Sequence, residues 1–225
     1  GGIMTTNERR IYERAIAFGH YARHDELTLS DLKAGAGLPW GGYKYRMNQL
    51  TSAMCRVQLR YYPKLMEEID RAMNYFWDLL EGVPGIRPHR PPKDSGSTKG
   101  GWYAPHGLYR PEELGGLSIF RFCEAVRAEG APCTPGCNRA LHLHPIFNTI
   151  DVYRQGKPTR IANCPPGVDV RQPPGSLPVS EGIQERVFSV PWFKHFRKEI
   201  IEEYAEAFKK VAENYEDLLP GDVKK

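Results

Sequence analysis

The chain has 225 residues, of which 26% are charged and 40% are hydrophobic, as in a folded globular protein. Its 31 Lys and Arg against 27 Asp and Glu give a formal charge of +4, a field too weak to indicate nucleic-acid binding. No stretch approaches the roughly 20 consecutive apolar residues of a membrane span, and no secretory signal opens the chain. We therefore expect neither a nucleic-acid nor a membrane partner.

The chain has five cysteines, an odd number, scattered through a sequence large enough to fold without disulfides. Since no secretory signal precedes them, we expect reduced thiols in a cytoplasmic protein.

The first expected elements are a short strand at residues 1–6 and a helix that Asn7 caps and that runs to about Tyr21. The strand has no partner strand before it, so the chain looks as though it begins in the middle of a sheet. The expected apolar stripe of the helix is Ile11, Ala15, Ile16 and Phe18.

Glycine-rich residues 23–42 predict an irregular loop. Asn48 is expected to cap a helix over residues 49–62, which Pro63 kinks or breaks. A second helical stretch with apolar residues at 3–4 spacing continues to about residue 80, and Gly82 is a suitable C-cap.

The second half predicts a mixture of strands and helices, which is the pattern of an α/β or α+β fold. Residues 135–177 read mostly as loop, and a loop that long is either functional or poorly ordered. The other expected elements are a loop at 88–100, strands at 102–109, 131–134 and 187–190, and helices at 118–128, 178–186 and 197–219.

The chemically richest stretch is residues 41–49, where two glycines are followed by Lys44, Arg46 and two tyrosines just before a helix. The first N–H groups of a helix together with two cations suit an anion. The residue types alone favour a solvated basic loop over an anion site. No glycine-rich nucleotide fingerprint occurs anywhere in the chain.

His142 and His144, with Cys133 and Cys137 upstream, resemble a zinc ligand set. Their spacing of C-x3-C and H-x-H fits none of the common structural zinc patterns, so we expect no metal. A nucleophilic Cys–His pair is also poorly supported, because five cysteines and seven histidines produce such pairs by chance. The favoured interpretation is that one histidine of this pair lines a polar pocket.

The order of several segments resembles the DegT/DnrJ/EryC1/StrS aminotransferases. Residues 42–50 are similar to that family's G-Y-N-Y-R-M-(N/S/T)-(E/N)-L signature, which is fairly specific. The other similar segments are individually loose but stand in the family's order: residues 1–7, 128–132, 141–145, 177–181 and 188–191.

The resemblance implies an α/β fold, the C-terminal part of a fold-type-I transferase that depends on pyridoxal 5′-phosphate (PLP). Residues 1–82 would end the large PLP domain with long interdomain helices, and residues 83–225 would form the small C-terminal domain. Two departures from the family stand out. Lys44 replaces the asparagine that reaches the cofactor phosphate of the neighbouring subunit, and the Schiff-base lysine is expected upstream of Gly1.

By the same resemblance, the whole enzyme would transfer an amino group from glutamate or glutamine to a keto-sugar, usually nucleotide-linked, or a keto-cyclitol. It would be a homodimer with active sites shared between subunits, and these 225 residues alone would be inactive. Lys44 and Arg46 would bind the cofactor, and Tyr43, His142 and His20 the substrate. The alternative is a non-catalytic, truncated relative that serves for dimerisation or anion binding.

Overall fold

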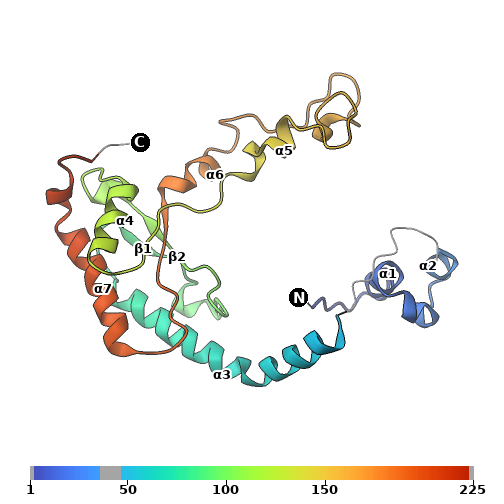
Figure 1. Cartoon of the computed structure of the whole chain (residues 1–225), viewed down its shortest axis with the longest axis horizontal. Helices are drawn as coiled ribbons and strands as arrows, with labels where there is room; N and C mark the ends of the chain where they lie inside the picture. Colours follow the sequence, from blue (N-terminus) through green and yellow to red (C-terminus); the bar gives the residue numbers. More distant parts are fainter. Residues whose placement is uncertain (1–2, 36–46, 223–225) are drawn as a thin grey trace. The chain divides into compact units, whose positions relative to one another are not determined.

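The computed structural model describes residues 3–35 and 47–222. The chain divides into two compact units, Gly1–Pro63 and Lys64–Lys225. Figure 1 shows that the described part of the first unit is helical, whereas the sheet lies in the second. The predicted domain division at residues 82 and 83 concerned the domains of a larger protein and stays a prediction.

The first unit contains α1 (Arg9–Gly19), a 3-10 helix (Tyr21–Glu26), α2 (Ser30–Gly35) and the beginning of α3 (Gln49–Leu79). The predicted strand at residues 1–6 is wrong as far as the structure describes it, because residues 3–6 pair with no other strand. The predicted irregular loop is also partly wrong, since two short helices occupy much of residues 21–35.

Helix α1 buries a carboxylate where the sequence predicted a wider apolar stripe. Its buried residues are Glu13, Ile16 and Gly19, while Ile11 is 49% exposed. Glu13 accepts hydrogen bonds from the Thr28 hydroxyl at 2.6 Å and from the Leu29 N–H at 2.9 Å. These bonds tie α1 to the segment that precedes α2.

Helix α3 begins as predicted, with the Asn48 side chain accepting a hydrogen bond from the Thr51 N–H at 2.8 Å. Of the kink or break predicted at Pro63, the break does not occur, because one helix continues to Leu79. An interior proline removes a single backbone hydrogen bond, and the rest of a 31-residue helix holds it in place. The buried residues all follow Pro63 at helical spacing: Ile69, Ala72, Met73, Phe76 and Trp77.

The second unit has a three-stranded antiparallel sheet in the order β1-β2-β3. Ile86 pairs with Tyr109, and Leu108 pairs with Val187. The sequence predicted β2 and β3 but not β1, while residues 131–134 form no strand. The strands are β1 (Ile86–Pro88), β2 (His106–Tyr109) and β3 (Val187–Ser189), and the further helices are α4 (Ile119–Ala128), α5 (Pro145–Asn148), α6 (Pro178–Gly182) and α7 (Lys198–Glu213).

The core of the second unit is aromatic and lies between the sheet and helices α3, α4 and α7. The ring of Phe208 packs against those of Phe76 and Phe188 at centroid distances of 5.6 and 5.8 Å. A β-carbon on Gly107 would lie 2.6 Å from the Phe188 ring and 2.8 Å from that of Trp77. Only glycine therefore lets β2 approach this cluster.

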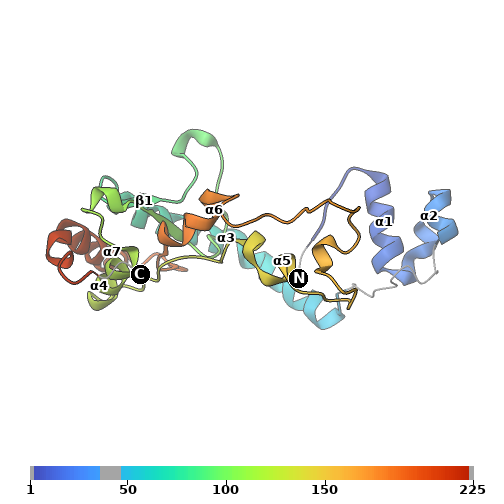
Figure 2. The same ribbon diagram turned by 90° about the horizontal axis from the view of Figure 1, so that it is seen from above.

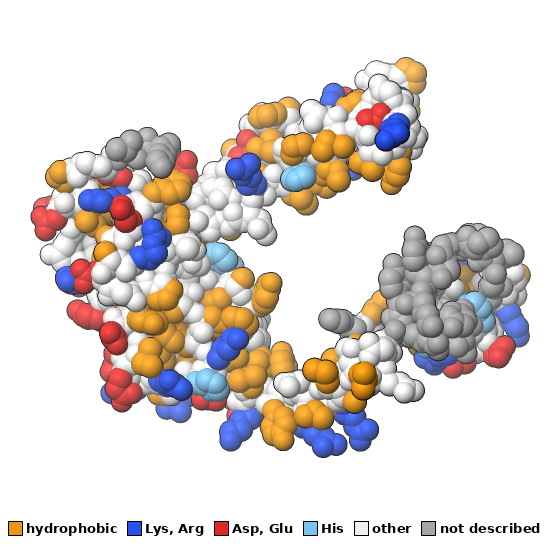
Figure 3. Space-filling model, in the orientation of Figure 1, with side chains coloured by type: hydrophobic (Ala, Val, Ile, Leu, Met, Phe, Trp, Pro, Cys, Tyr) orange, Lys and Arg blue, Asp and Glu red, His pale blue; other side chains and the backbone are white. Residues whose placement is uncertain are grey.

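None of residues 134–186 is buried, in contrast to the segments on either side. This 134–186 segment carries α5, α6 and several 3-10 turns, and Figure 2 shows it as a long excursion from the sheet. Figure 3 shows hydrophobic side chains over much of its visible surface. Of the helices that the structure describes, none combines the length and apolar character needed to cross a bilayer.

Candidate functional site

The structure describes two of the five predicted site residues. Tyr43, Lys44 and Arg46 lie outside the described residues. His20 is the C-cap of α1 in the first unit, where its N–H donates to the Ile16 carbonyl at 2.9 Å. His142 lies in the second unit and lines a cavity, so a role in binding substrate stays a prediction for each of these residues.

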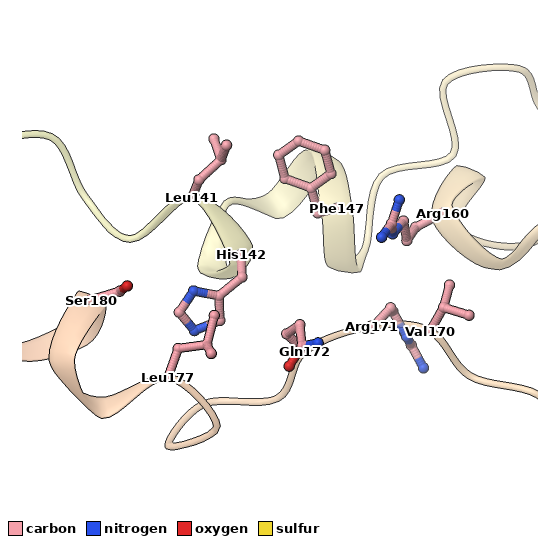
Figure 4. A pocket seen from close by; sticks show the side chains of 9 residues that line it. All are labelled: Leu141, His142, Phe147, Arg160, Val170, Arg171, Gln172, Leu177 and Ser180. Carbon is pink, nitrogen blue, oxygen red and sulfur yellow. The ribbon is translucent and has the colours of Figure 1, made fainter.

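The cavity at His142 has a volume of about 340 Å³ and is formed entirely by the 134–186 segment. Figure 4 shows Ser180 and Arg160 at opposite ends, with His142 and Phe147 between them. Its walls combine apolar and hydrogen-bonding side chains, from Leu141, His142, Phe147, Arg160, Val170, Arg171, Gln172, Leu177 and Ser180.

Two prolines begin the short helices that border the cavity. Pro145 and Pro178 stand in the first turns of α5 and α6, where a missing N–H costs no helical hydrogen bond. The His144 ring accepts a hydrogen bond from the Ile146 N–H at 3.2 Å and so caps α5. The sequence predicted the start of α6 at Pro178 but not α5.

Glu181 fixes the orientation of His142. Its carboxylate lies 3.0 Å from Nε2 of His142 and also accepts hydrogen bonds from the N–H groups of Gly175 and Leu177. The Gly175 N–H and then His142 hold the pKa of Glu181 below its ordinary value, against the effect of burial. An ionised Glu181 places the proton of a neutral His142 on Nε2, so Nδ1 is left as a hydrogen-bond acceptor.

The two arginines of the cavity differ in their partners. Arg171 donates to Asp169 at 2.9 Å through Nε and to the Asn148 carbonyl at 2.9 Å through Nη1. Its guanidinium and the N–H of Arg171 hold the pKa of Asp169 at about 2. The Arg160 side chain forms no hydrogen bond or ion pair with residues 3–35 or 47–222, so its charge is uncompensated there.

The sequence did not reveal Glu181, Arg160 or Arg171 as parts of a site. Glu181 follows His142 by 39 positions, and no short motif links the two residues. Two features of the sequence could have indicated a site here: the unusual length of the 135–177 loop, and an acidic residue in the first turn after Pro178.

The cysteines predicted as poor zinc ligands do not gather around His142. Cys133 is buried in the core with its Sγ 3.2 Å from that of Cys123, whereas Cys137 is exposed. Among the described residues, no group of three His, Cys, Asp or Glu side chains is placed to hold a metal ion.

The cavity is suited to binding an organic anion and to holding a proton at His142. It does not fit PLP, since no lysine lines it. Lys93 and Lys99, which line a different cavity, contact Asp78 and the His89 carbonyl respectively. The His142 cavity therefore offers no lysine to which this cofactor could be attached.

The family of DegT/DnrJ/EryC1/StrS aminotransferases has a model that matches residues 1–209 of the chain. No curated protein matches. Among solved structures, an aminotransferase from Psychrobacter cryohalolentis is 18% identical with a TM-score of 0.62, covering 94% of this chain and 51% of that one.

Two further structures are similar. A putative sugar aminotransferase from Streptococcus pneumoniae, in its PMP form, is 15% identical with a TM-score of 0.54, covering 96% of this chain and 48% of that one. DesI, solved in the presence of its TDP-sugar product, is 18% identical with a TM-score of 0.54, covering 85% of this chain and 45% of that one. The chain thus spans about half the length of these structures, and the predicted α/β fold of a PLP-dependent transferase is confirmed.

Proposed function

This chain belongs to the DegT/DnrJ/EryC1/StrS aminotransferase family, and from this membership we propose that it is the C-terminal portion of a PLP-dependent aminotransferase. The whole enzyme transfers an amino group from glutamate or glutamine to a keto-sugar, nucleotide-linked, or to a keto-cyclitol. The observation that carries the proposal is the length of the family match, which runs from residue 1 to residue 209.

The substrate class is supported by what similar proteins are described as doing. DesI was solved with a TDP-sugar product, and the Streptococcus pneumoniae protein is described as a putative sugar aminotransferase in the PMP form. The cavity at His142 adds a place in this chain where an anionic sugar derivative can bind.

PLP supplies the electron sink that transamination needs, and a lysine must hold it. From the family resemblance we place the Schiff-base lysine upstream of Gly1, and the lining of the His142 cavity, which contains no lysine, is compatible with this. Lys44 and Arg46 then bind the cofactor phosphate from the end of the large domain. Tyr43, His20 and His142 contact the substrate.

The proposed enzyme is a cytoplasmic homodimer whose subunits share their active sites. The first half of α3 supports this assembly, since Leu50 is 80% exposed and Met54 is 68% exposed on a helix without a covering partner in the described first unit. Residues 1–82 belong to the large domain and residues 83–225 to the small one.

The alternative function is a non-catalytic relative that binds an anion or dimerises. It is favoured by the same observation that limits the first proposal, a cavity with an uncompensated arginine and no lysine. The two functions differ in amino transfer, which only the first performs.

The test uses the natural polypeptide that carries this sequence, purified with added PLP. We expect L-glutamate or L-glutamine to convert the cofactor to its amine form, seen as a change in its absorption spectrum. A TDP-linked keto-sugar should then restore the PLP spectrum and gain an amino group, as judged by mass spectrometry. A cofactor spectrum that neither donor changes would contradict the proposal and favour the alternative.

A further inference from the structure

Lys99 lies in the loop between β1 and β2 and lines a second cavity, which shares no residue with the cavity at His142. The Lys99 ammonium donates a hydrogen bond to the His89 carbonyl at 2.5 Å. Its Nζ also lies 3.3 Å from Nδ1 of His89 and 5.1 Å from the centre of the Trp102 ring. The amine is thus held by a carbonyl, an imidazole and the face of an indole.

No carboxylate stabilises the charged form of Lys99. Among the residues that the structure describes, no Asp or Glu side chain forms an ion pair with it. The nearby carboxylates have other partners, since Asp70 accepts from Nε1 of Trp102 at 2.8 Å and Asp78 is paired with Arg90 at 2.8 Å. Burial without an opposite charge lowers the pKa of Lys99.

The ionisable groups closest to Lys99 are basic. Burial, followed by the positive charges of Lys99 and His106, lowers the pKa of His89 and favours its neutral form. Lys93, the other lysine of this cavity, differs because its Nζ lies 3.1 Å from the carboxylate of Asp78. A free amine is therefore more available at Lys99 than at Lys93.

The backbone that follows Lys99 is fixed in an uncommon conformation. Trp102 and Ala104 have φ angles of 53° and 47°, in the left-handed region that residues other than glycine rarely adopt. Trp102 is 1% exposed, and Nδ1 of His106 lies 2.7 Å from the Ala104 carbonyl. Such strain persists only where the surrounding structure holds it, so the indole beneath the Lys99 amine has a defined position.

We propose that Lys99 is an acylation site of this chain, modified by a short-chain acyl phosphate. The Lys99 ammonium loses one proton to water, and the free amine attacks the carbonyl carbon of the donor. An N–C bond forms as the C–O bond to the phosphate breaks, and the phosphate leaves with that electron pair and with the second proton of the amine. The resulting amide keeps one N–H for the His89 carbonyl.

The size of the cavity favours a small acyl group. Its volume of about 220 Å³ lies below the range of about 300–1,000 Å³ for small-molecule sites. An acetyl group fits such a space, whereas the substituted pyridine ring of PLP is too large for it. The proposal therefore does not make Lys99 a site for PLP, and it goes beyond the proposed amino transfer without depending on it.

The test is incubation of the natural polypeptide with acetyl phosphate near neutral pH, followed by digestion and mass spectrometry of each lysine. Lys93 and Lys210 are the comparison sites, since Lys210 also has a carboxylate partner, Glu129 at 2.7 Å. Because a pKa that is lower by one leaves about ten times more free amine, initial acetylation at Lys99 should be about 3- to 10-fold faster than at either site. In concentrated urea the three rates should become similar.

Two variants of His89 test whether the missing carboxylate explains the reactivity. His89 is exposed, so neither replacement is expected to impair folding. His89→Glu places a carboxylate beside Lys99 and should slow its acetylation by about 3- to 10-fold. His89→Gln is the matched neutral variant and should leave the rate nearly unchanged. Acetylation of Lys93 is the internal control in both variants.

Three results would overturn the proposal. The first is acetylation of Lys99 in the folded protein that is no faster than that of Lys93. The second is a preference for Lys99 that persists in urea, which would assign it to the local sequence. The third is an equal rate at Lys99 in His89→Glu and His89→Gln. Because no step of this test requires PLP or an amino donor, a failure here leaves the proposed amino transfer intact, and the converse holds too.

Discussion

At the scale of single residues, Glu13 shows how a completely buried carboxylate stays charged. Burial alone would raise the pKa of Glu13, but the Thr28 hydroxyl, the Leu29 N–H, Arg9 and the Thr28 N–H all stabilise the ionised form. Their combined effect holds the pKa at about 2. The charged Glu13 carboxylate therefore links α1 to the segment before α2, and its hydrogen bonds compensate for the cost of burying it.

Replacing Glu13 should make the stability of the first unit less dependent on pH. A carboxyl with a lowered pKa stabilises the folded state above its unfolded pKa of about 4.5, and this contribution disappears as the pH falls toward 2. We expect Glu13→Gln to increase hydrogen exchange in α1 at pH 7, with a smaller difference from the wild type below pH 4.

The control for Glu13 is Glu8→Gln, which removes an exposed carboxylate from the same end of the chain. Equal protection of α1 in both variants at pH 7 would show that the Glu13 network does not stabilise this unit.

The buried thiols make a second prediction at this scale. Cys123 raises the pKa of Cys133 through their hydrogen bond, and burial raises it further, so this thiol resists ionisation. We expect Cys137 to react with a disulfide reagent in the folded protein, and Cys123 and Cys133 only after denaturation. Peptide mapping of the labelled protein identifies the reacted thiols, and rapid native labelling of Cys133 would contradict the described core.

The sequence could indicate some of these residues but not their partners. His142 lies in the lining of a cavity, and its role in binding substrate stays a prediction. Its contact with Glu181 joins two positions that are too far apart in the sequence for helical or strand periodicity to reveal. The sequence also does not show that the carboxylate of Asp169 contacts Arg171 and not Arg160.

At the scale of elements, α4 is held at its N-terminus by the end of the chain. The Ser118 hydroxyl accepts a hydrogen bond from the Arg121 N–H at 3.2 Å and donates to the Asp222 carboxylate. Asp222 also accepts from the Ser118 N–H at 2.7 Å. One serine thus caps a helix and attaches the C-terminal segment that follows α7.

Removing this cap should destabilise the second unit. Loss of an N-cap side chain costs about 1 kcal/mol, so Ser118→Ala should lower the free energy of unfolding by about that amount. Ser118→Thr keeps the hydroxyl and should restore most of the stability in urea denaturation. Identical midpoints for the alanine and threonine variants would show that the hydroxyl contributes nothing.

Helices with a capping residue and a clear apolar stripe were predicted well. A strand that is defined mainly by its pairing with another strand was not. Ser118 and Asn48 cap helices as expected, and the residues after Pro63 bury the predicted stripe. Strand β1 is only three residues long and is defined by its pairing with β2, so its sequence has too few positions to show alternation. The break at Pro63 failed because a proline's local cost does not decide where a long helix ends.

At the scale of the whole molecule, stability is unevenly distributed within the second unit. The aromatic core unites the sheet with α3, α4 and α7, whereas the 134–186 segment buries no residue. Regions with few buried contacts open at a lower free energy than the core. The candidate site therefore lies in the part of this unit that opens most easily.

Hydrogen exchange should reveal this difference directly. We expect amides of the 134–186 segment to exchange well before those of α4 and α7. Peptides from α7 serve as the internal control. Equal protection of the segment and α7 would mean that the segment is held by contacts that the described residues do not show.

The family could be predicted because the order of several weak motifs is itself informative. That prediction is confirmed by the match over residues 1–209, and the fold by structures of which the chain covers about half. The substrate and the cofactor site could not be derived in the same way. The donors that define a ligand come together only in the folded cavity, and the predicted cofactor residues lie outside the described residues.

The most direct test of the account maps the lysine that binds PLP. The natural polypeptide is incubated with PLP, reduced with borohydride, digested, and searched by mass spectrometry for a pyridoxyl group. We predict one modified lysine in a peptide that is absent from the 225-residue sequence. A pyridoxyl group on a lysine within this sequence, or none on any lysine, would contradict it.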